Sequence, residues 1–239
     1  MEIHGKHLLG GVPEAESPRL FYAINPATGQ PLEPGFHEAL PEEVDHALHL
    51  ADGAFPALRA LTPAQRAALL RAIAEEIMAL GDLLLDRAHA ETGLPMARLQ
   101  GERTRTINQT HLFADLIEEG SWAQPRIDRG DPSRQPLPKP DVRSMLMPIG
   151  PIAVFGASNF PLAIGVAGTD TISALGAGCP VVAKAHPAHP GTSVLLGHAI
   201  QQAIERSGAP AGSFSMLQGA GHAMGIAMVQ HPLTRAVAF

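Results

Sequence analysis

The sequence predicts an α/β fold built on a doubly wound parallel sheet. Between residues 148 and 239, short apolar runs alternate with segments of helical periodicity. Strands and helices in strict alternation favour parallel strands joined by right-handed crossovers. Residues 41–120 carry long helical patterns, which we expect to form a helical layer beside that sheet.

The amino-terminal 40 residues predict extended segments linked by turns. They are rich in Gly and Pro and contain the turn sequence Asn25-Pro26-Ala27-Thr28-Gly29. From Pro41 the pattern becomes helical. Thr62 is a capping residue followed by Pro63 and Gln65, and the apolar positions after it predict a secure helix: 69, 70, 73, 77 and 80.

Two further helices are bounded by glycines. One is expected from about residue 82 to 92, where Gly93 can take the left-handed conformation that ends a helix. A longer one is expected from about residue 95 to 119, ended by Gly120.

Residues 123–147 interrupt this regularity. Charged residues alternate there with prolines at positions 125, 132, 136, 138 and 140, so no compact domain is expected. The segment is either a disordered linker or an extended arm that pairs with another subunit. Apolar alternation resumes from 142 to 147, as in an extended segment. The chain is therefore divided into residues 1–122, 123–147 and 148–239.

The last part predicts the sheet itself. Strands are expected at about 150–156, 180–184, 213–217 and 235–239, with helices near 161–176, 190–207 and 221–230. The apolar side chains of the last strand need a covering layer, so residues 1–239 on their own are expected to associate.

Composition excludes several functional classes. The chain has 45% hydrophobic and 17% charged residues, a formal charge of −6 and no run of basic residues, which disfavours nucleic-acid binding. Cys179 is the only cysteine, so no intrachain disulfide can form. No signal-like or membrane-spanning apolar run is present, and the expected location is the cytoplasm.

The turn after the first strand of the sheet is the leading candidate for chemistry. An apolar run ends at Phe155 and leads into Gly156, Ala157, Ser158 and Asn159. Pro161 is expected at the first helical position. The Asn159 amide could donate a hydrogen bond to an oxyanion, a role worth about 2.7–4 kcal/mol. Alternatively, it could simply cap the following helix.

Two other chemical interpretations of short motifs are disfavoured. Ser158 would need a small residue two places later to form the nucleophile elbow of a hydrolase, and that residue is Phe160. His186 and His189 resemble a metal-binding pair, but Pro187 and Pro190 prevent a regular helix, and no third ligand is close in sequence. We therefore expect no metal site there.

Two more features point to a nucleotide. Lys184 ends an apolar strand, which places its ammonium group at the carboxyl edge where open parallel sheets bind nucleotides, although solvated strand-end lysines are also common. Residues 219–225 form a glycine-containing turn before a helix without the usual dinucleotide spacing. Tight packing of helix on sheet would explain those glycines equally well.

Four segments in a fixed order carry a resemblance to a known family: NPATG (25–29), PIGPIAVFGASNFP (148–161), GCPVVAKAHPAHPGTS (178–193) and HPLTRAVAF (231–239). With them the chain resembles the amino-terminal half of NAD(P)-dependent aldehyde dehydrogenases. The resemblance implies that Asn159 stabilises the oxyanion of the thiohemiacetal. It implies a Rossmann-like cofactor domain with an oligomerisation arm, in a full-length protein that acts on a small aldehyde as a homodimer or homotetramer. The composition given above predicts neither a nucleic-acid nor a membrane partner. Residues implied to contact the cofactor are Phe155, Gly156, Ala157, Ser158, Lys184, His186, Gly221, Gly225 and Phe239.

The resemblance also bears on the cofactor. In the family, the Lys matching Lys184 binds the adenosine ribose, and many NAD-preferring members carry a Glu three residues later. Pro187 stands at that position here, so no carboxylate repels a 2′-phosphate. His186 beside it can donate a hydrogen bond. NADP is therefore expected to serve at least as well as NAD.

The chain matches only part of the family's machinery. Its catalytic Cys and general-base Glu belong to the other half, and Cys179 lies in a loop suited to packing. Residues 1–239 alone are therefore expected to be inactive. The pattern is most similar to the subgroup that oxidises 2-oxoglutarate semialdehyde (2,5-dioxopentanoate). The alternatives are the long-chain fatty aldehyde dehydrogenases, or a non-catalytic nucleotide-binding module if the chain is naturally this short.

Overall fold

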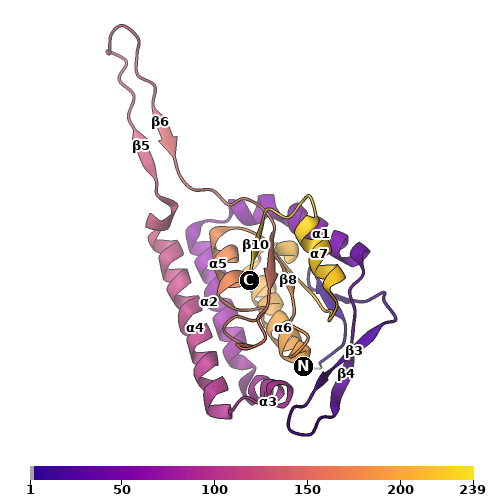
Figure 1. The fold of residues 1–239 in the computed structure, drawn as a ribbon. Helices are drawn as coiled ribbons and strands as arrows, with labels where there is room; N and C mark the ends of the chain where they lie inside the picture. Colours follow the sequence, from indigo (N-terminus) through magenta and orange to yellow (C-terminus); the bar gives the residue numbers. More distant parts are fainter. Residues whose placement is uncertain (1–2) are drawn as a thin grey trace.

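The computed structural model describes residues 3–239 and is organised around one central sheet (Figure 1). Within the described residues this sheet has six strands in the order β10-β7-β8-β9-β1-β2. Their bounds are β1 His7–Leu9, β2 Val12–Glu14, β7 Ile152–Phe155, β8 Val181–Lys184, β9 Phe214–Leu217 and β10 Ala236–Ala238. The four strands from β7 to β10 are mutually parallel, which confirms the predicted α/β class.

Two of the amino-terminal extended segments are part of the main sheet, which the sequence did not indicate. β1 pairs antiparallel with β9, with Leu8 opposite Met216, and β2 folds back on β1. Gly10 and Gly11 have positive φ angles of 53° and 92° in the turn between them, a conformation that favours glycine. The parallel sheet is thus extended by two strands that are joined to it through antiparallel pairs. A separate two-stranded sheet is formed by β3 Leu20–Ile24 and β4 Pro31–His37.

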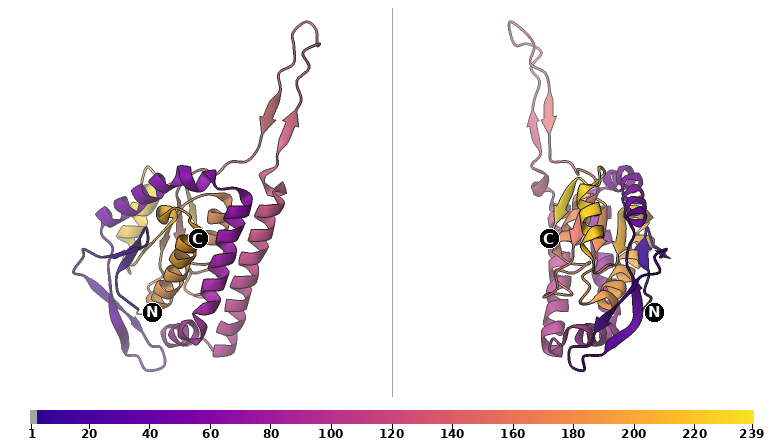
Figure 2. Two further views of the ribbon diagram at one scale, coloured as in Figure 1. Left: turned by 180° about the vertical axis from the view of Figure 1, so that it is seen from behind. Right: turned by 45° about the vertical axis from the view of Figure 1, so that its right-hand side comes forward.

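Helices cover both faces of the main sheet. Alternate residues of a strand point to opposite faces, so Ile152 and Val154 join one core while Ala153 joins the other. The first core packs against α2 Pro63–Ala79, α5 Thr169–Ala177 and α6 Pro190–Ser207. The second packs against α1 Pro41–Ala60 and α7 His222–Gln230. The sheet is therefore doubly wound, as predicted (Figure 2).

The helical layer forms where the local signals place it. α2 begins after Thr62, whose hydroxyl accepts a hydrogen bond from the Gln65 amide. α3 Gly81–Thr92 and α4 Met96–Glu119 end at Gly93 and Gly120, with φ angles of 66° and 85°. Short 3₁₀ turns lie at Ser121–Ala123 and Ala211–Ser213. None of the helices in residues 3–239 is both long and apolar enough to cross a membrane.

The prediction of a helix over 161–176 is wrong in its first half. α5 begins only at Thr169, and Pro161 lies in a series of turns rather than at a first helical position. The amides of Leu162 and Ala163 donate to the buried Glu102 carboxylate at 2.8 and 2.9 Å. A side chain on Gly168 would lie 2.6 Å from the Ala163 carbonyl oxygen. Because the Glu102 carboxylate binds these two amides and the backbone at Gly168 lies close to that at Ala163, the segment before Thr169 forms compact turns instead of a continuous helix.

Residues 123–147 form a hairpin that projects away from the rest of the molecule (Figure 1). β5 Arg126–Asp128 pairs antiparallel with β6 Val142–Ser144. Several apolar side chains are exposed along it: Ile127 at 63%, Leu137 at 68%, Val142 at 53% and Met145 at 57%. The segment is an ordered, extended arm in this structure.

Candidate functional site

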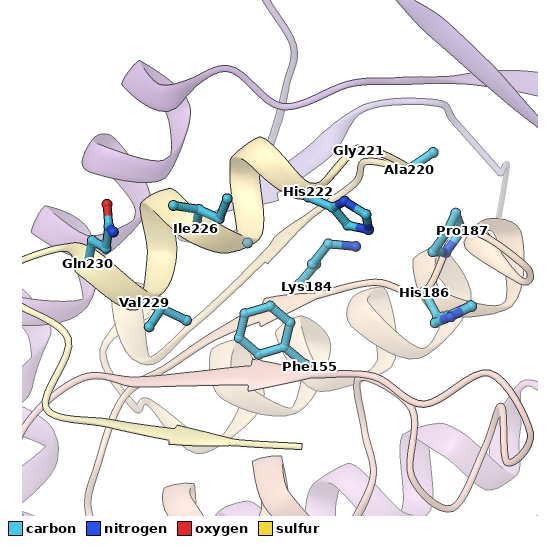
Figure 3. A pocket seen from close by; sticks show the side chains of 11 residues that line it. Phe155, Lys184, His186, Pro187, Ala220, Gly221, His222, Ile226, Val229 and Gln230 are labelled. Atoms are coloured by element: carbon cyan, nitrogen blue, oxygen red, sulfur yellow. The ribbon is translucent and has the colours of Figure 1, made fainter.

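A cavity of about 860 Å³ opens at the carboxyl ends of the parallel strands (Figure 3). Ligands of open α/β sheets bind in this position. Three elements form its walls: the end of β7, the end of β8 with the loop after it, and one side of α7. The lining residues are Phe155, Lys184, His186, Pro187, Ala220, Gly221, His222, Gly225, Ile226, Val229 and Gln230.

The apolar wall depends on close contact between β7 and α7. Phe155 ends β7, and a Cβ atom on Gly225 would lie 3.2 Å from its ring. Glycine thus lets the helix approach the ring, so the packing interpretation of this glycine is supported. Ile226 and Val229 are 55% and 50% exposed and face the same cavity (Figure 3). Together these side chains offer a flat apolar surface.

Lys184 supplies the cationic group of the cavity. Its ammonium nitrogen Nζ donates to the carbonyl of Gly219 at 3.0 Å, which links the end of β8 to the turn before α7. Partial burial lowers the pKa of Lys184, and the nearby Glu38 carboxylate opposes this effect. The side chain extends into the cavity beside His222 (Figure 3).

His186 is a neutral hydrogen-bond donor. Burial, together with the nearby His189 and Lys184, lowers its pKa to about 4. Its Nδ1 accepts from the Ala188 amide at 3.2 Å, so the proton of the neutral ring is on Nε2. The ring stacks on that of His189 with centroids 5.6 Å apart. At neutral pH the residue therefore contributes a donor N–H and no charge.

Glu38 is a site residue that the sequence did not indicate. Its carboxylate accepts hydrogen bonds from the amides of Ala220 at 3.1 Å and Gly221 at 3.4 Å, at the start of α7. A negative charge at a helix amino terminus is favourable. The peptide group between Gly219 and Ala220 is thus held on both sides, by Lys184 at its oxygen and by Glu38 at its nitrogen.

The Asn159 turn lies at the same edge of the sheet, outside the cavity lining. The Gly156 amide donates to the Lys184 carbonyl at 3.0 Å, and the Ala157 carbonyl is bonded to the buried His189 ring at 2.8 Å. Ser158 and Asn159 are exposed. Arg98 donates to the Asn159 carbonyl at 2.8 Å. In residues 3–239 the Asn159 amide side chain has no hydrogen-bond partner, so it is free to bind a ligand.

Two buried carboxylates position the loops around this edge. Glu102 holds the turns after Asn159, and Glu91 accepts from the amides of Gly191 and Thr192, both at 2.8 Å, at the start of α6. Burial raises the pKa of Glu91, while Arg87 and these hydrogen bonds oppose the rise. In the sequence, the only sign that Glu91 and Glu102 bind these loops is that each is a glutamate on the buried face of a helix.

The structure brings together part of the predicted set. Five predicted residues line the cavity: Phe155, Lys184, His186, Gly221 and Gly225. The others lie along the same edge outside the lining: Gly156, Ala157, Ser158, Asn159 and Phe239. Phe239 follows β10, next to the end of β7, and is 93% exposed. Residues missed by the sequence analysis are Glu38, Ala220, His222, Ile226, Val229 and Gln230.

The arrangement can bind a ligand, and it lacks a nucleophile of its own. Cys179 is 5% exposed and precedes β8, so it lies at the edge of the sheet opposite the cavity. Its predicted packing role is consistent with this burial. Ser158 has no hydrogen bond to a histidine or a carboxylate within the described residues, so no nucleophile and base pair forms there. The cavity presents apolar side chains and the Lys184 ammonium group, and the exposed Asn159 amide lies at the same edge of the sheet.

Comparisons with known proteins show which proteins this chain is similar to. Alpha-ketoglutaric semialdehyde dehydrogenase 2 of Azospirillum brasilense is 52% identical over 240 residues, covering 100% of this chain and 46% of that protein. Alpha-ketoglutaric semialdehyde dehydrogenase of Acinetobacter baylyi is 44% identical over 238 residues, covering 100% of this chain and 45% of that protein. The chain thus spans about half the length of these curated relatives.

Solved structures share the fold. An NADP-dependent enzyme of E. coli has a TM-score of 0.82 and 27% identity, covering 98% of this chain and 46% of that one. An NAD-dependent benzaldehyde dehydrogenase of Corynebacterium glutamicum has a TM-score of 0.81 and 28% identity, covering 98% and 48%. The aldehyde dehydrogenase family profile matches residues 13–239. From the match over nearly its whole length and from the site described above, this chain belongs to the aldehyde dehydrogenase family.

Proposed function

We propose that the complete protein is an NAD(P)-dependent aldehyde dehydrogenase that oxidises 2-oxoglutarate semialdehyde to 2-oxoglutarate, and that residues 1–239 supply its cofactor-binding half. One observation carries the proposal. A cavity with an apolar wall and the Lys184 ammonium group opens at the carboxyl ends of parallel strands, beside the exposed Asn159 amide. A carbonyl substrate and a nucleotide can bind side by side at such an edge.

The residues of the cavity fit an adenosine group. Phe155, Ile226 and Val229 offer an apolar surface for a planar base, and Lys184 offers a donor for ribose hydroxyls. Pro187 lines the cavity and carries no charge, while the Nε2–H of His186 can donate to a 2′-phosphate. We therefore infer that NADP is used at least as efficiently as NAD. When bound, the nicotinamide cofactor supplies the hydride acceptor of the oxidation.

Asn159 acts in this proposal as the oxyanion donor. Attack of a cysteine thiolate on an aldehyde moves negative charge to the carbonyl oxygen, and an uncharged amide N–H placed there stabilises that charge. The Asn159 side chain is exposed and unpaired within residues 3–239, and the Arg98 hydrogen bond fixes the backbone beside it. The thiolate and the general base belong to the remainder of the enzyme.

The substrate follows from the relatives. Both curated relatives named above are called alpha-ketoglutaric semialdehyde dehydrogenases, and both cover the whole of this chain. This supports 2-oxoglutarate semialdehyde over the long-chain fatty aldehydes. The alternative is a non-catalytic nucleotide-binding module, since the residues described hold no nucleophile at the cavity.

The projecting hairpin suits a homo-oligomer. Its strands are short, and its exposed apolar residues include Ile127 and Val142. Exposed backbone donors and acceptors at a strand edge pair readily with another strand. We infer that residues 123–147 contact a second copy of the chain in a dimer or tetramer. We also propose that the enzyme works in the cytoplasm.

Substitution of Asn159 tests the proposal. In the full-length protein, Asn159→Ala should lower kcat for 2-oxoglutarate semialdehyde by roughly 100-fold or more, measured as NADPH formation. Asn108→Ala, at an exposed asparagine on α4, is the matched control and should leave kcat unchanged. An Asn159→Ala protein with native circular dichroism and unchanged kcat would remove Asn159 from the mechanism.

A further inference from the structure

We propose that Asp45, His49 and His231 form a binding site for a divalent transition-metal ion, with Zn²⁺ as the reference ion. The ligand atoms of the three side chains all lie within 4.8 Å of one another. His231 Nε2 is 3.1 Å from Asp45 Oδ1, and His49 Nδ1 is 3.2 Å from Asp45 Oδ2. His49 Nδ1 also donates to the backbone carbonyl of Asp45 at 2.9 Å, a hydrogen bond that an ion would replace. The cluster is separate from the cofactor cavity.

Helices α1 and α7 place the three side chains next to one another. Asp45 and His49 are four residues apart on α1, so they lie on the same face of the helix. His231 directly follows α7. α1 and α7 pack against the same face of the sheet through a shared core that includes Leu48 and Met228. The two elements that would carry the ligands are therefore fixed relative to each other before any ion binds.

The orientation of His231 is also set. Its Nδ1 accepts a hydrogen bond from the Leu233 amide at 3.2 Å, so the ring proton is on Nε2 and donates to Asp45. Binding of an ion at Nε2 would move that proton to Nδ1 and replace the Leu233 hydrogen bond. The His231 side chain is 12% exposed, whereas those of Asp45 and His49 are 59% and 62% exposed. An ion can therefore reach the cluster from solvent and keep a water ligand.

The donor set and its spacing suit zinc. Two imidazole nitrogens and one carboxylate oxygen are ligands that Zn²⁺ prefers, whereas Ca²⁺ and Mg²⁺ prefer oxygen ligands alone. Tetrahedral ligands about 2.0–2.1 Å from zinc lie about 3.3–3.4 Å apart. The observed separations of 3.1 and 3.2 Å are close to this value, so small side-chain movements would admit an ion.

A bound ion would connect α1 to the end of α7. Gln230, which precedes His231, lines the cofactor cavity, as does Val229. The ion would thus add a second attachment for the helix that forms one wall of that cavity. Metal binding itself does not depend on the proposed dehydrogenase activity, and it can be measured without substrate or cofactor.

Isothermal titration of the full-length protein with Zn²⁺, after removal of metals by a chelator, tests the site. We expect one ion per chain and a higher melting temperature with Zn²⁺. His49→Gln, at an exposed position, should weaken binding at least about tenfold, and His231→Gln should do the same. His46→Gln is the matched control, because His46 is exposed on the same helix and, within residues 3–239, is paired with Glu14 at 3.8 Å rather than with the cluster.

Binding that is lost in His49→Gln and retained in His46→Gln would establish the site. Absence of binding at millimolar Zn²⁺ would overturn the proposal, and the cluster would then be a set of hydrogen bonds centred on Asp45. Equal binding by the wild-type and His49→Gln proteins would overturn it as well, since the ion would then be held by other histidines of the chain.

Discussion

Replacement of Glu91 by Ala should destabilise the protein more than any surface substitution. Glu91 is 4% exposed and accepts three hydrogen bonds from the start of α6: from the Gly191 amide, the Thr192 amide and the Thr192 hydroxyl, at 2.7–2.8 Å. Arg87 Nε donates to it at 3.0 Å. Alanine would leave two buried amides and a guanidinium group without their acceptor.

The expected loss of unfolding free energy is about 3–5 kcal/mol, the range for breaking a buried charged pair by removing one partner. For a domain of about 150–250 residues, this loss of free energy corresponds to a fall in melting temperature of roughly 6–20 °C. Glu91→Gln keeps one acceptor oxygen and should have a smaller effect. Because Gly191 follows the loop that carries His186, the KM for the cofactor should rise as well.

Thermal unfolding followed by circular dichroism measures the effect. Glu75→Gln is the control, because Glu75 is 65% exposed in its pair with Arg206 and should contribute less than about 1 kcal/mol. A Glu91→Ala protein that melts within about 2 °C of the wild type would refute the reasoning, since this is less than about 1 kcal/mol. The start of α6 would then be held by packing alone.

Three further predictions concern the cavity and the buried or half-buried histidines of the chain. The specificity constant for NADP should equal or exceed that for NAD, and His186→Ala should lower the NADP constant roughly 2- to 10-fold, the value of one neutral hydrogen bond; a strong NAD preference would mean that another group excludes the 2′-phosphate. Glu38→Ala should raise the cofactor KM by roughly 3- to 10-fold with a smaller change in kcat, because the Ala220 and Gly221 amides lose their acceptor; an unchanged KM would show that the turn holds its shape without the carboxylate. Stability should fall as the pH falls from 6.5 towards 4, because the unfolded chain then binds protons that the folded chain does not, and melting temperatures at pH 7.5 and 5 that are equal would contradict this. Burial lowers the pKa of the histidines responsible below the ordinary 6.5: His4, His7, His186, His189 and His198.

Local signals were sufficient for most of the fold. The Thr62 cap and the glycine stops at Gly93 and Gly120 act within one helical turn, so helix ends could be read directly from the residues. Alternation of strands and helices determined the parallel sheet. Since parallel strands end at one edge, Phe155 and Lys184 could be placed beside each other from the sequence, and they are paired in the structure.

Only the tertiary structure decided which distant groups meet. Glu38 binds amides at 220 and 221, and Glu102 holds the turns that replace the first half of the predicted helix at 161–176. These pairs are separated by 60 residues or more, and no local pattern encodes which buried amide a carboxylate will reach. The pKa of about 4 for His186 likewise depends on burial by neighbouring elements. Short-range propensity therefore determined the elements, whereas the packing of layers determined the electrostatics of the site.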